Sequence, residues 1–150
     1  RGDIRMKNFL FILVAALVAN GAFAQVESTP ASETAIANIN EASQEGWMQM
    51  NVEDAANYLF EVEPVLVDVR TEGEFGDGYI EGAVNFPVTE LDQFLGDMPS
   101  DLDTPILIYC AAGVRGNWAL FYVTSLGYTN VKNMSGGYNA WTDAGYPTTN

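Results

Sequence analysis

The sequence predicts an α/β domain with a mainly parallel β-sheet, and its apolar segments are the main reason. Two unbroken apolar runs read PVLVDVR (residues 64–70) and PILIY (residues 105–109), as strands do when both faces of a parallel sheet are covered. Helix-like segments alternate with these runs, which is typical of such sheets. With 150 residues and 48% hydrophobic content, the chain suits one compact domain with its own core.

The first 46 residues are expected to lie outside this domain. Residues 1–5 precede the first methionine and look like upstream sequence, and residues 6–24 have the basic start, apolar run and small residues of a signal peptide cleaved after Ala24. The apolar run is shorter than the roughly 20 residues that a membrane span needs. Residues 25–46 read as a flexible acidic linker. We therefore expect a domain over residues 47–150 in a periplasmic or secreted protein, with no membrane attachment after cleavage.

The charge of the mature chain excludes two classes of partner. Without residues 1–24 the chain keeps three of its six basic residues and 19 of its 20 acidic residues, a net charge of −16. So acidic a protein repels nucleic acid and anionic membranes. Its remaining cations are Arg70, Arg115 and Lys132.

Local signals place the other elements. Asn51 is a good N-cap, and Gly127 is a normal residue just beyond the end of a helix. Leucine, phenylalanine and methionine side chains share one face of the segment that begins at Thr89. Helices are expected over residues 51–59, 89–98, 117–126 and 138–144, and further short strands over residues 47–50 and 130–134.

Cys110 is the only cysteine of the chain, and it directly follows the second apolar run. Ligands of parallel sheets bind at the carboxyl ends of the strands, where Asp68 and Arg70 also lie at the end of the first run. An odd cysteine in an exported protein is reactive or forms an intermolecular bond, whereas a buried one can simply be a small apolar residue. The position at a strand end favours the reactive role.

The loop from Cys110 to Arg115 predicts a cradle for an anion. A loop that leads from a strand back into a helix can aim consecutive N–H groups inward, and Gly113 permits the tight path. The same field stabilises a thiolate, which predicts a nucleophilic Cys110. Because the chain has no histidine, Cys–His and Ser–His catalysis are excluded, and activation by loop dipoles and Arg115 remains.

No cofactor or metal is expected. One cysteine and no histidine cannot form a zinc site, and the spacing of Asp97, Asp101 and Asp103 does not match a calcium-binding loop. The glycines at 76, 78 and 82 do not match a dinucleotide-binding fingerprint.

Several motifs follow one another along the chain: the strand end Asp68-Val69-Arg70, a Glu-Phe pair, a Gly-x-Ile-x-Gly-Ala-x-Asn segment, the loop Cys110–Arg115, and Gly-Gly-x-x-x-Trp over residues 136–141. In this order, from about residue 47 to 147, they resemble a single rhodanese-like (thiosulfate sulfurtransferase) domain. The resemblance implies a central five-stranded, mainly parallel sheet flanked by helices.

The resemblance also implies sulfur transfer through a persulfide on Cys110. The donor would be thiosulfate or a related small anion, and the acceptor cyanide or a thiol. Arg115 would attract the donor, and Asp68 and Arg70 would brace the site, with Arg70 paired to Glu74. The backbone N–H groups expected to cradle the persulfide and the donor belong to Ala111, Ala112, Gly113, Val114 and Arg115.

Two departures and two alternatives accompany this interpretation. Tyr79 stands where family members usually have histidine, and Ala111 and Ala112 make the loop less basic than in strong thiosulfate users, which argues against efficient turnover. One alternative is a sulfur carrier or thiol redox sensor that acts with a partner protein and turns over little by itself. The other is a phosphatase, but those enzymes have five residues between cysteine and arginine, and this loop has four.

Overall fold

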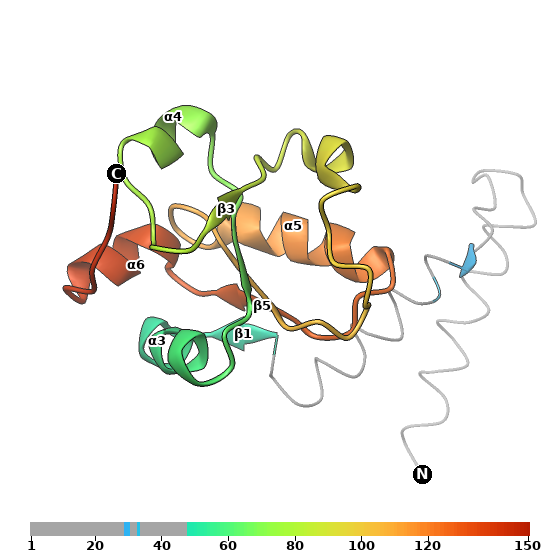
Figure 1. Cartoon of the computed structure of the whole chain (residues 1–150), viewed down its shortest axis with the longest axis horizontal. Helices are drawn as coiled ribbons and strands as arrows, with labels where there is room; N and C mark the ends of the chain where they lie inside the picture. Colours follow the sequence, from blue (N-terminus) through green and yellow to red (C-terminus); the bar gives the residue numbers. More distant parts are fainter. Residues whose placement is uncertain (1–28, 31–32, 34–47) are drawn as a thin grey trace, which may run out of the picture.

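Residues 48–150 form a five-stranded parallel sheet with helices on both faces (Figure 1). The computed structural model describes residues 29–30, 33 and 48–150, so residues 1–5, the expected signal peptide and nearly all of the expected linker lie outside the described residues. The strand order is β1-β5-β4-β2-β3, with every neighbouring pair parallel. The predicted α/β class and its five-stranded sheet are confirmed. The strands are β1 (Gln49–Met50), β2 (Val65–Asp68), β3 (Val84–Asn85), β4 (Ile106–Tyr109) and β5 (Val131–Met134).

Side-chain caps fix the start of two of the helices. The Asn51 side chain accepts a hydrogen bond from the Asp54 N–H at 2.9 Å and starts α3. Thr71 and Glu74 cap each other at the start of α4. No helix among the described residues is long and apolar enough to cross a membrane. Within residues 48–150 the helices are α3 (Val52–Glu61), α4 (Glu72–Gly76), α5 (Val114–Ser125) and α6 (Gly137–Asp143), with one 3₁₀ helix, η1 (Leu91–Phe94).

The central strands bury both of their faces, which explains why their sequences are unbroken apolar runs. Ile106 and Ile108 of β4 belong to a core that includes Ala119 and Val123 of α5. Leu107, between them, belongs to the opposite core, which α3 and α6 cover. Figure 1 shows the resulting arrangement, with α5 on one side of the sheet and α3 and α6 on the other.

The helix expected over residues 89–98 is wrong in length, because only Leu91–Phe94 is helical, as a 3₁₀ turn. Leu91 and Met98 do pack against the core, and Phe94 stacks on Phe86 with ring centroids 4.5 Å apart, whereas Leu95 is exposed. Gly96 is a weak helix former, and Pro99 disfavours a helical conformation at the residue before it. The segment therefore turns away after one turn.

The helix expected from residue 117 begins three residues earlier, at Val114, and ends one residue earlier, at Ser125. Its N-cap is Gly113 in a left-handed conformation with no side-chain cap, so the usual start signal is absent from the sequence. α3 extends two residues beyond its expected end, and α6 lies one residue closer to the N-terminus than expected. The earlier start of α5 brings the helix directly to the Cys110 loop.

Candidate functional site

Cys110 leaves the carboxyl end of β4 and lies buried, with 1% of its surface exposed. The backbone N–H of Gly113 donates a hydrogen bond to its Sγ atom at 3.1 Å. Gly113 has φ +92°, and a Cβ atom there would lie 3.2 Å from the backbone N of Gly136. A left-handed conformation and a close neighbour thus both favour glycine at the residue that contacts the sulfur.

The loop carbonyls are held by the start of α6. Tyr138 N–H donates to the Cys110 carbonyl at 2.7 Å, and Asn139 N–H donates to the Ala111 carbonyl at 3.0 Å. Gly137 makes this contact feasible, because a Cβ there would lie 2.1 Å from the Cys110 carbonyl oxygen. In a trans peptide the N–H points opposite to the carbonyl, so the N–H groups of Ala111 and Ala112 point away from α6.

The N-terminus of α5 completes the loop. The first backbone hydrogen bond of this helix runs from the Asn117 N–H to the Gly113 carbonyl at 3.2 Å. The N–H groups of Val114, Arg115 and Gly116 precede that bond, and a helix N-terminus of this kind favours a negative charge. The five residues predicted to form the cradle therefore run from the thiol into the first turn of α5, in an arrangement suited to an anion at the sulfur.

A buried amide side chain anchors this loop from β5. The Asn133 Nδ2 atom lies 3.1 Å from the Gly113 carbonyl oxygen, 2.8 Å from Asn117 Oδ1 and 3.2 Å from Gln49 Oε1. Its Oδ1 atom is buried without a hydrogen-bond partner among the described residues. That atom fills the space beside Gly116, where a Cβ would come within 2.1 Å of it. Asn133 thus fixes the carbonyl of the same residue whose N–H contacts the sulfur.

Arg115 is paired with Glu74 by two contacts, Nη1 to Oε2 and Nη2 to Oε1, both at 2.7 Å. The hydrogen bond from Arg115 lowers the pKa of Glu74 to about 2. The pKa of Arg115 is raised, chiefly by the hydrogen bond to Glu74 and also by the nearby Cys110. The predicted cation thus lies by the thiol, but its charge is already shared with a carboxylate.

The expected pairing of Arg70 with Glu74 is wrong, because Arg70 pairs with Asp68 instead. Arg70 Nη2 lies 2.7 Å from Asp68 Oδ2 and also donates to the Gly78 carbonyl at 2.7 Å. The Arg70 guanidinium lies 4.0 Å from the centre of the Tyr138 ring in α6. Asp68 and Arg70 are two residues apart at the end of the strand, so their buried side chains pair directly and Arg70 does not pair with Glu74.

This buried pair lies on the face of the sheet that α6 covers, whereas Cys110 belongs to the core under α5. The Asp68–Arg70 pair is linked to the Cys110 loop by backbone hydrogen bonds between β2 and β4. β2 and β4 are paired up to Asp68 and Tyr109, and the Val69 N–H donates to the Tyr109 carbonyl at 2.9 Å, one residue before Cys110. Asp68 and Arg70 therefore brace the strand ends from the opposite face.

Sequence reasoning missed Glu74 as the partner of Arg115, and it missed Asn133, Gln49 and Asn117 altogether. The sequence held one signal for Glu74. Thr71-x-x-Glu74 is a capping-box pattern, which predicts a helix start at α4 and ties the Glu74 side chain to that helix start. The amide network joins residues that are 16 to 84 positions apart and has no local signal. Across residues 29–30, 33 and 48–150, no cluster of three or more His, Cys, Asp or Glu residues could hold a metal ion.

Known proteins are similar to this chain in sequence and in fold. The family model for the rhodanese-like domain matches residues 51–144. A sulfurtransferase of Allochromatium vinosum is 34% identical over 100 residues, which cover 66% of this chain and 92% of that protein. The thiosulfate sulfurtransferase GlpE of Shewanella oneidensis is 33% identical over 79 residues, 53% of this chain and 76% of that protein.

Solved structures agree with the sequence relatives. The human single-domain sulfurtransferase TSTD1 superposes with a TM-score of 0.59 at 30% identity, over 64% of this chain and 96% of that chain. These comparisons support sulfur transfer as the general function. With a matching family model over more than half its length, the chain belongs to the rhodanese-like domain family.

Proposed function

We propose that this protein transfers sulfane sulfur from thiosulfate or a related small anion to cyanide or a thiol, through a persulfide on Cys110. The observation that carries the proposal is the hydrogen bond from the Gly113 N–H to the Cys110 sulfur, inside a loop whose first two carbonyls are tied to α6. Backbone donors held in this way stabilise negative charge on sulfur without reorganisation during the reaction. The similarity to a thiosulfate sulfurtransferase supports thiosulfate as the donor.

In the first step the Cys110 thiolate attacks the outer sulfur of thiosulfate. The new S–S bond forms as the bond between the two sulfur atoms of thiosulfate breaks, and sulfite leaves with the bonding electron pair. The enzyme is left with a persulfide anion, Cys110–S–S⁻, so charge and sulfur balance. In this proposal the N–H groups of Ala111 to Arg115 would cradle the terminal sulfur.

In the second step an acceptor attacks the terminal sulfur. Cyanide gives thiocyanate, and a thiolate gives an acceptor persulfide, while the Cys110 thiolate is the leaving group in both cases. The thiolate is then ready for another donor. No redox cofactor takes part, because the sulfane sulfur moves with its electrons balanced in each exchange.

Arg115 would act on the donor by contact. Its pair with Glu74 is neutral as a whole, so it exerts little attraction on a dianion at a distance. Both side chains are partly exposed, and an incoming oxyanion can take the place of the Glu74 carboxylate on the guanidinium. We infer that donor binding exchanges one carboxylate for one sulfonate-like group.

A second function rests on the burial of the thiol and the small residues around it. Cys110 is almost fully buried, and Ala111 and Ala112 add no positive charge beside it. Such a site suits a sulfur carrier or thiol redox sensor that works with a partner protein and turns over thiosulfate slowly. For either function we also propose that residues 6–24 act as a signal peptide and that the protein works in the periplasm or outside the cell.

A steady-state assay of the purified mature protein with thiosulfate and cyanide separates the two functions. Sustained thiocyanate formation that Cys110→Ser abolishes is expected of a sulfurtransferase. A single turnover of bound sulfur without sustained formation identifies the carrier. Thiocyanate formation by Cys110→Ser at the unaltered rate would contradict both, because each needs the sulfur of Cys110.

A further inference from the structure

α5 has large apolar side chains on the face that points away from the core. Its buried residues include Ala119, Leu120 and Val123, yet Val114, Trp118 and Phe121 are 60%, 62% and 53% exposed. These three follow each other at intervals of four and three residues and so form one stripe on successive turns. A helix that is apolar on both faces is typical of one covered on both sides, so this stripe needs a partner.

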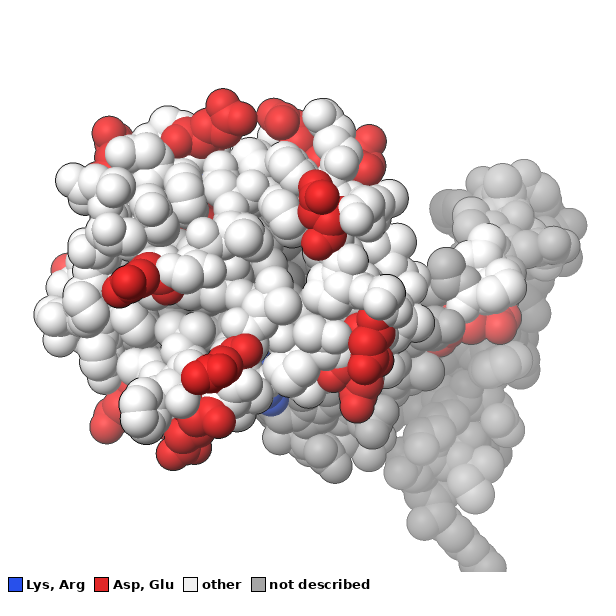
Figure 2. Space-filling model, in the orientation of Figure 1, with Lys and Arg blue, Asp and Glu red and all other residues white. Residues whose placement is uncertain are grey.

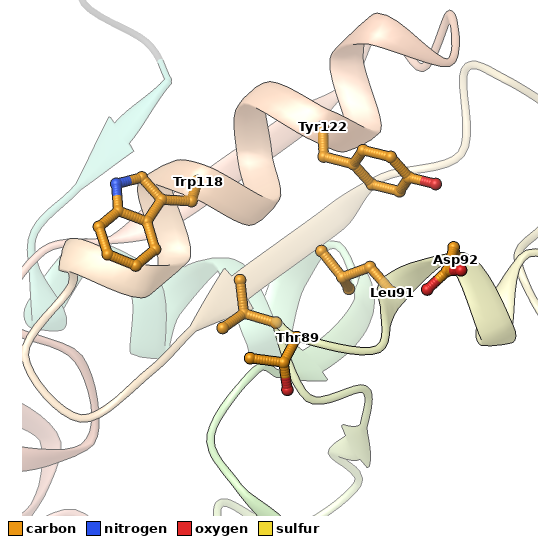
Figure 3. Close-up of a pocket in the computed structure, with 6 residues that line it drawn as sticks. Thr89, Leu91, Asp92, Trp118 and Tyr122 are labelled. Carbon is orange, nitrogen blue, oxygen red and sulfur yellow. The ribbon is translucent and has the colours of Figure 1, made fainter.

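A hollow of about 340 Å³ lies beside this stripe, between α5 and the chain that leads into η1. In Figure 3, Trp118 and Tyr122 extend from α5, Thr89 and Leu91 face them from the neighbouring segment, and Asp92 lies at the Tyr122 end. This groove is lined by Val88, Thr89, Leu91, Asp92, Trp118 and Tyr122.

The groove and the Cys110 loop both adjoin α5, since Trp118 and Tyr122 line the groove and the helix begins at Val114 within the loop. Arg115, Trp118 and Tyr122 follow at intervals of three and four residues, so they share one face of the helix. At 1.5 Å per residue, Trp118 lies about 5 Å along the axis from Arg115. A molecule seated on Trp118 therefore lies within one helical turn of Arg115, the last residue of the Cys110 loop.

The charge around the groove selects the partner. Asp92 is the only charged residue in the lining, and it is exposed. Residues 48–150 hold 15 acidic and three basic residues, and two of these three cations, Arg70 and Arg115, are already in ion pairs. Figure 2 shows the same imbalance, with acidic side chains spread over the visible face and hardly any basic ones. A positively charged partner is favoured, and a negatively charged one is repelled.

We propose that this groove docks a protein acceptor of sulfur, through a segment with an apolar side chain for Trp118, a lysine or arginine for Asp92, and a cysteine within reach of Cys110. The proposal rests on the proposed sulfur transfer and names the acceptor class of that site. Cyanide and other small acceptors need no such groove, since they occupy only the loop. An aromatic anchor beside a single opposite charge gives both affinity and orientation.

The test measures sulfur transfer from Cys110 persulfide, prepared with thiosulfate and verified by mass, to three acceptors. Two are synthetic peptides with one cysteine each, of which one has leucine and lysine near the cysteine and the other has serine and glutamate at those positions. The third is cyanide. The variants are Trp118→Ala, Asp92→Asn and, as a matched control, Phe60→Ala, which removes an 86% exposed aromatic side chain from α3.

We expect the basic apolar peptide to accept sulfur at least about tenfold faster than the acidic one. Trp118→Ala should lower transfer to the basic peptide by about tenfold and Asp92→Asn by a few-fold, while Phe60→Ala leaves it unchanged and cyanide reacts equally with all the proteins. Equal rates for both peptides, or equal effects of Trp118→Ala and Phe60→Ala, would overturn the groove.

Two further outcomes concern the occupant of the groove and the thiol site itself. A dimer of the unaltered protein in sedimentation that Trp118→Ala dissolves would make a second copy the occupant and would overturn the proposal. If no persulfide forms with thiosulfate, the proposed function itself fails. If it forms and the peptides are not discriminated, only the docking groove fails.

Discussion

Arg115 of α5 holds Glu74 of α4 by two contacts of 2.7 Å, and so joins the thiol loop to the segment that follows β2. The guanidinium is 27% exposed and the carboxylate 36% exposed. A pair of this kind holds a side chain in place but adds little to stability. The pair mainly affects binding of the sulfur donor, because the Arg115 guanidinium that would bind the donor is already paired with the Glu74 carboxylate.

Replacement of Glu74 by Gln is expected to improve donor binding. The variant removes one negative charge beside the site and frees the guanidinium, so the KM for thiosulfate should fall by about fivefold, equivalent to ~1 kcal/mol for one partly screened charge. Steady-state kinetics measure it. Glu72→Gln is the matched control, since it removes an exposed charge from the first turn of the same helix. A rise in KM would show that the donor needs Arg115 held by Glu74.

The Glu74 pair also predicts a pH dependence. The folded pKa of Glu74, lowered to about 2 by Arg115, lies below the roughly 4.3 of an unfolded glutamate. The pair therefore stabilises the fold above the unfolded pKa, and this contribution is lost as pH falls from about 4.3 towards 2.

Urea unfolding of the native protein and of Glu74→Gln measures this contribution. The difference in unfolding free energy should be constant and below about 1 kcal/mol above pH 5, and should shrink between pH 4 and pH 2. The same difference at pH 2.5 and pH 7 would mean that Glu74 is not the ionised partner.

Gly116 is the position where a single methyl group should disturb the thiol loop. A Cβ there would lie 2.1 Å from Asn133 Oδ1, so Gly116→Ala should push the Asn133 side chain away from the Gly113 carbonyl. Unfolding free energy should fall by about 1–3 kcal/mol, although alanine is the better helix former. Persulfide formation should slow as Gly113 loses its anchor.

Gly73→Ala is the control for this change, because Gly73 is also helical and nothing lies within 4 Å of a Cβ there. Urea unfolding and the rate of persulfide formation are compared for both variants. If Gly116→Ala and Gly73→Ala have the same unfolding free energy and the same rate of persulfide formation, Asn133 does not anchor the loop.

The fold was predictable because it depends on patterns within short segments. The apolar runs of β2 and β4 indicate burial on both faces, and the Asn51 cap marks the start of α3. Cys110 was predicted as the candidate nucleophile from its place at a strand end and from the motifs around it. The start of α5 at Val114 was not predicted, because its N-cap Gly113 has no side chain that could cap the helix.

The pairing of charges was not predictable in the same way. Glu74 is four residues from Arg70 and 41 from Arg115, so sequence proximity favoured the wrong partner. The choice is made in three dimensions, because the buried Asp68 carboxylate already takes the Arg70 guanidinium on the opposite face of the sheet. Asn133 holds the loop by a hydrogen bond to the Gly113 carbonyl. The two residues are 20 positions apart, so no local sequence pattern predicts this contact.

The size of the loop predicts that the protein does not hydrolyse aryl phosphates. Four residues separate Cys110 from Arg115, and the Gly113 N–H points at the sulfur itself. Such a ring suits one sulfur atom on Cys110, whereas phosphate needs room for a phosphorus atom and its oxygens. Release of nitrophenol from nitrophenyl phosphate is the assay, with Cys110→Ser as the control. Hydrolysis that depends on Cys110 would favour the phosphatase alternative instead.

The mass of the intact protein after thiosulfate treatment tests the central claim most directly. We expect the unaltered protein to gain the mass of one sulfur atom, to lose it with a thiol reductant or cyanide, and Cys110→Ser to gain nothing. Serine is nearly isosteric with cysteine, so the variant should keep the fold, which circular dichroism can verify. An unchanged mass of the folded, reduced protein after thiosulfate treatment, or an equal gain in Cys110→Ser, would contradict a persulfide on Cys110.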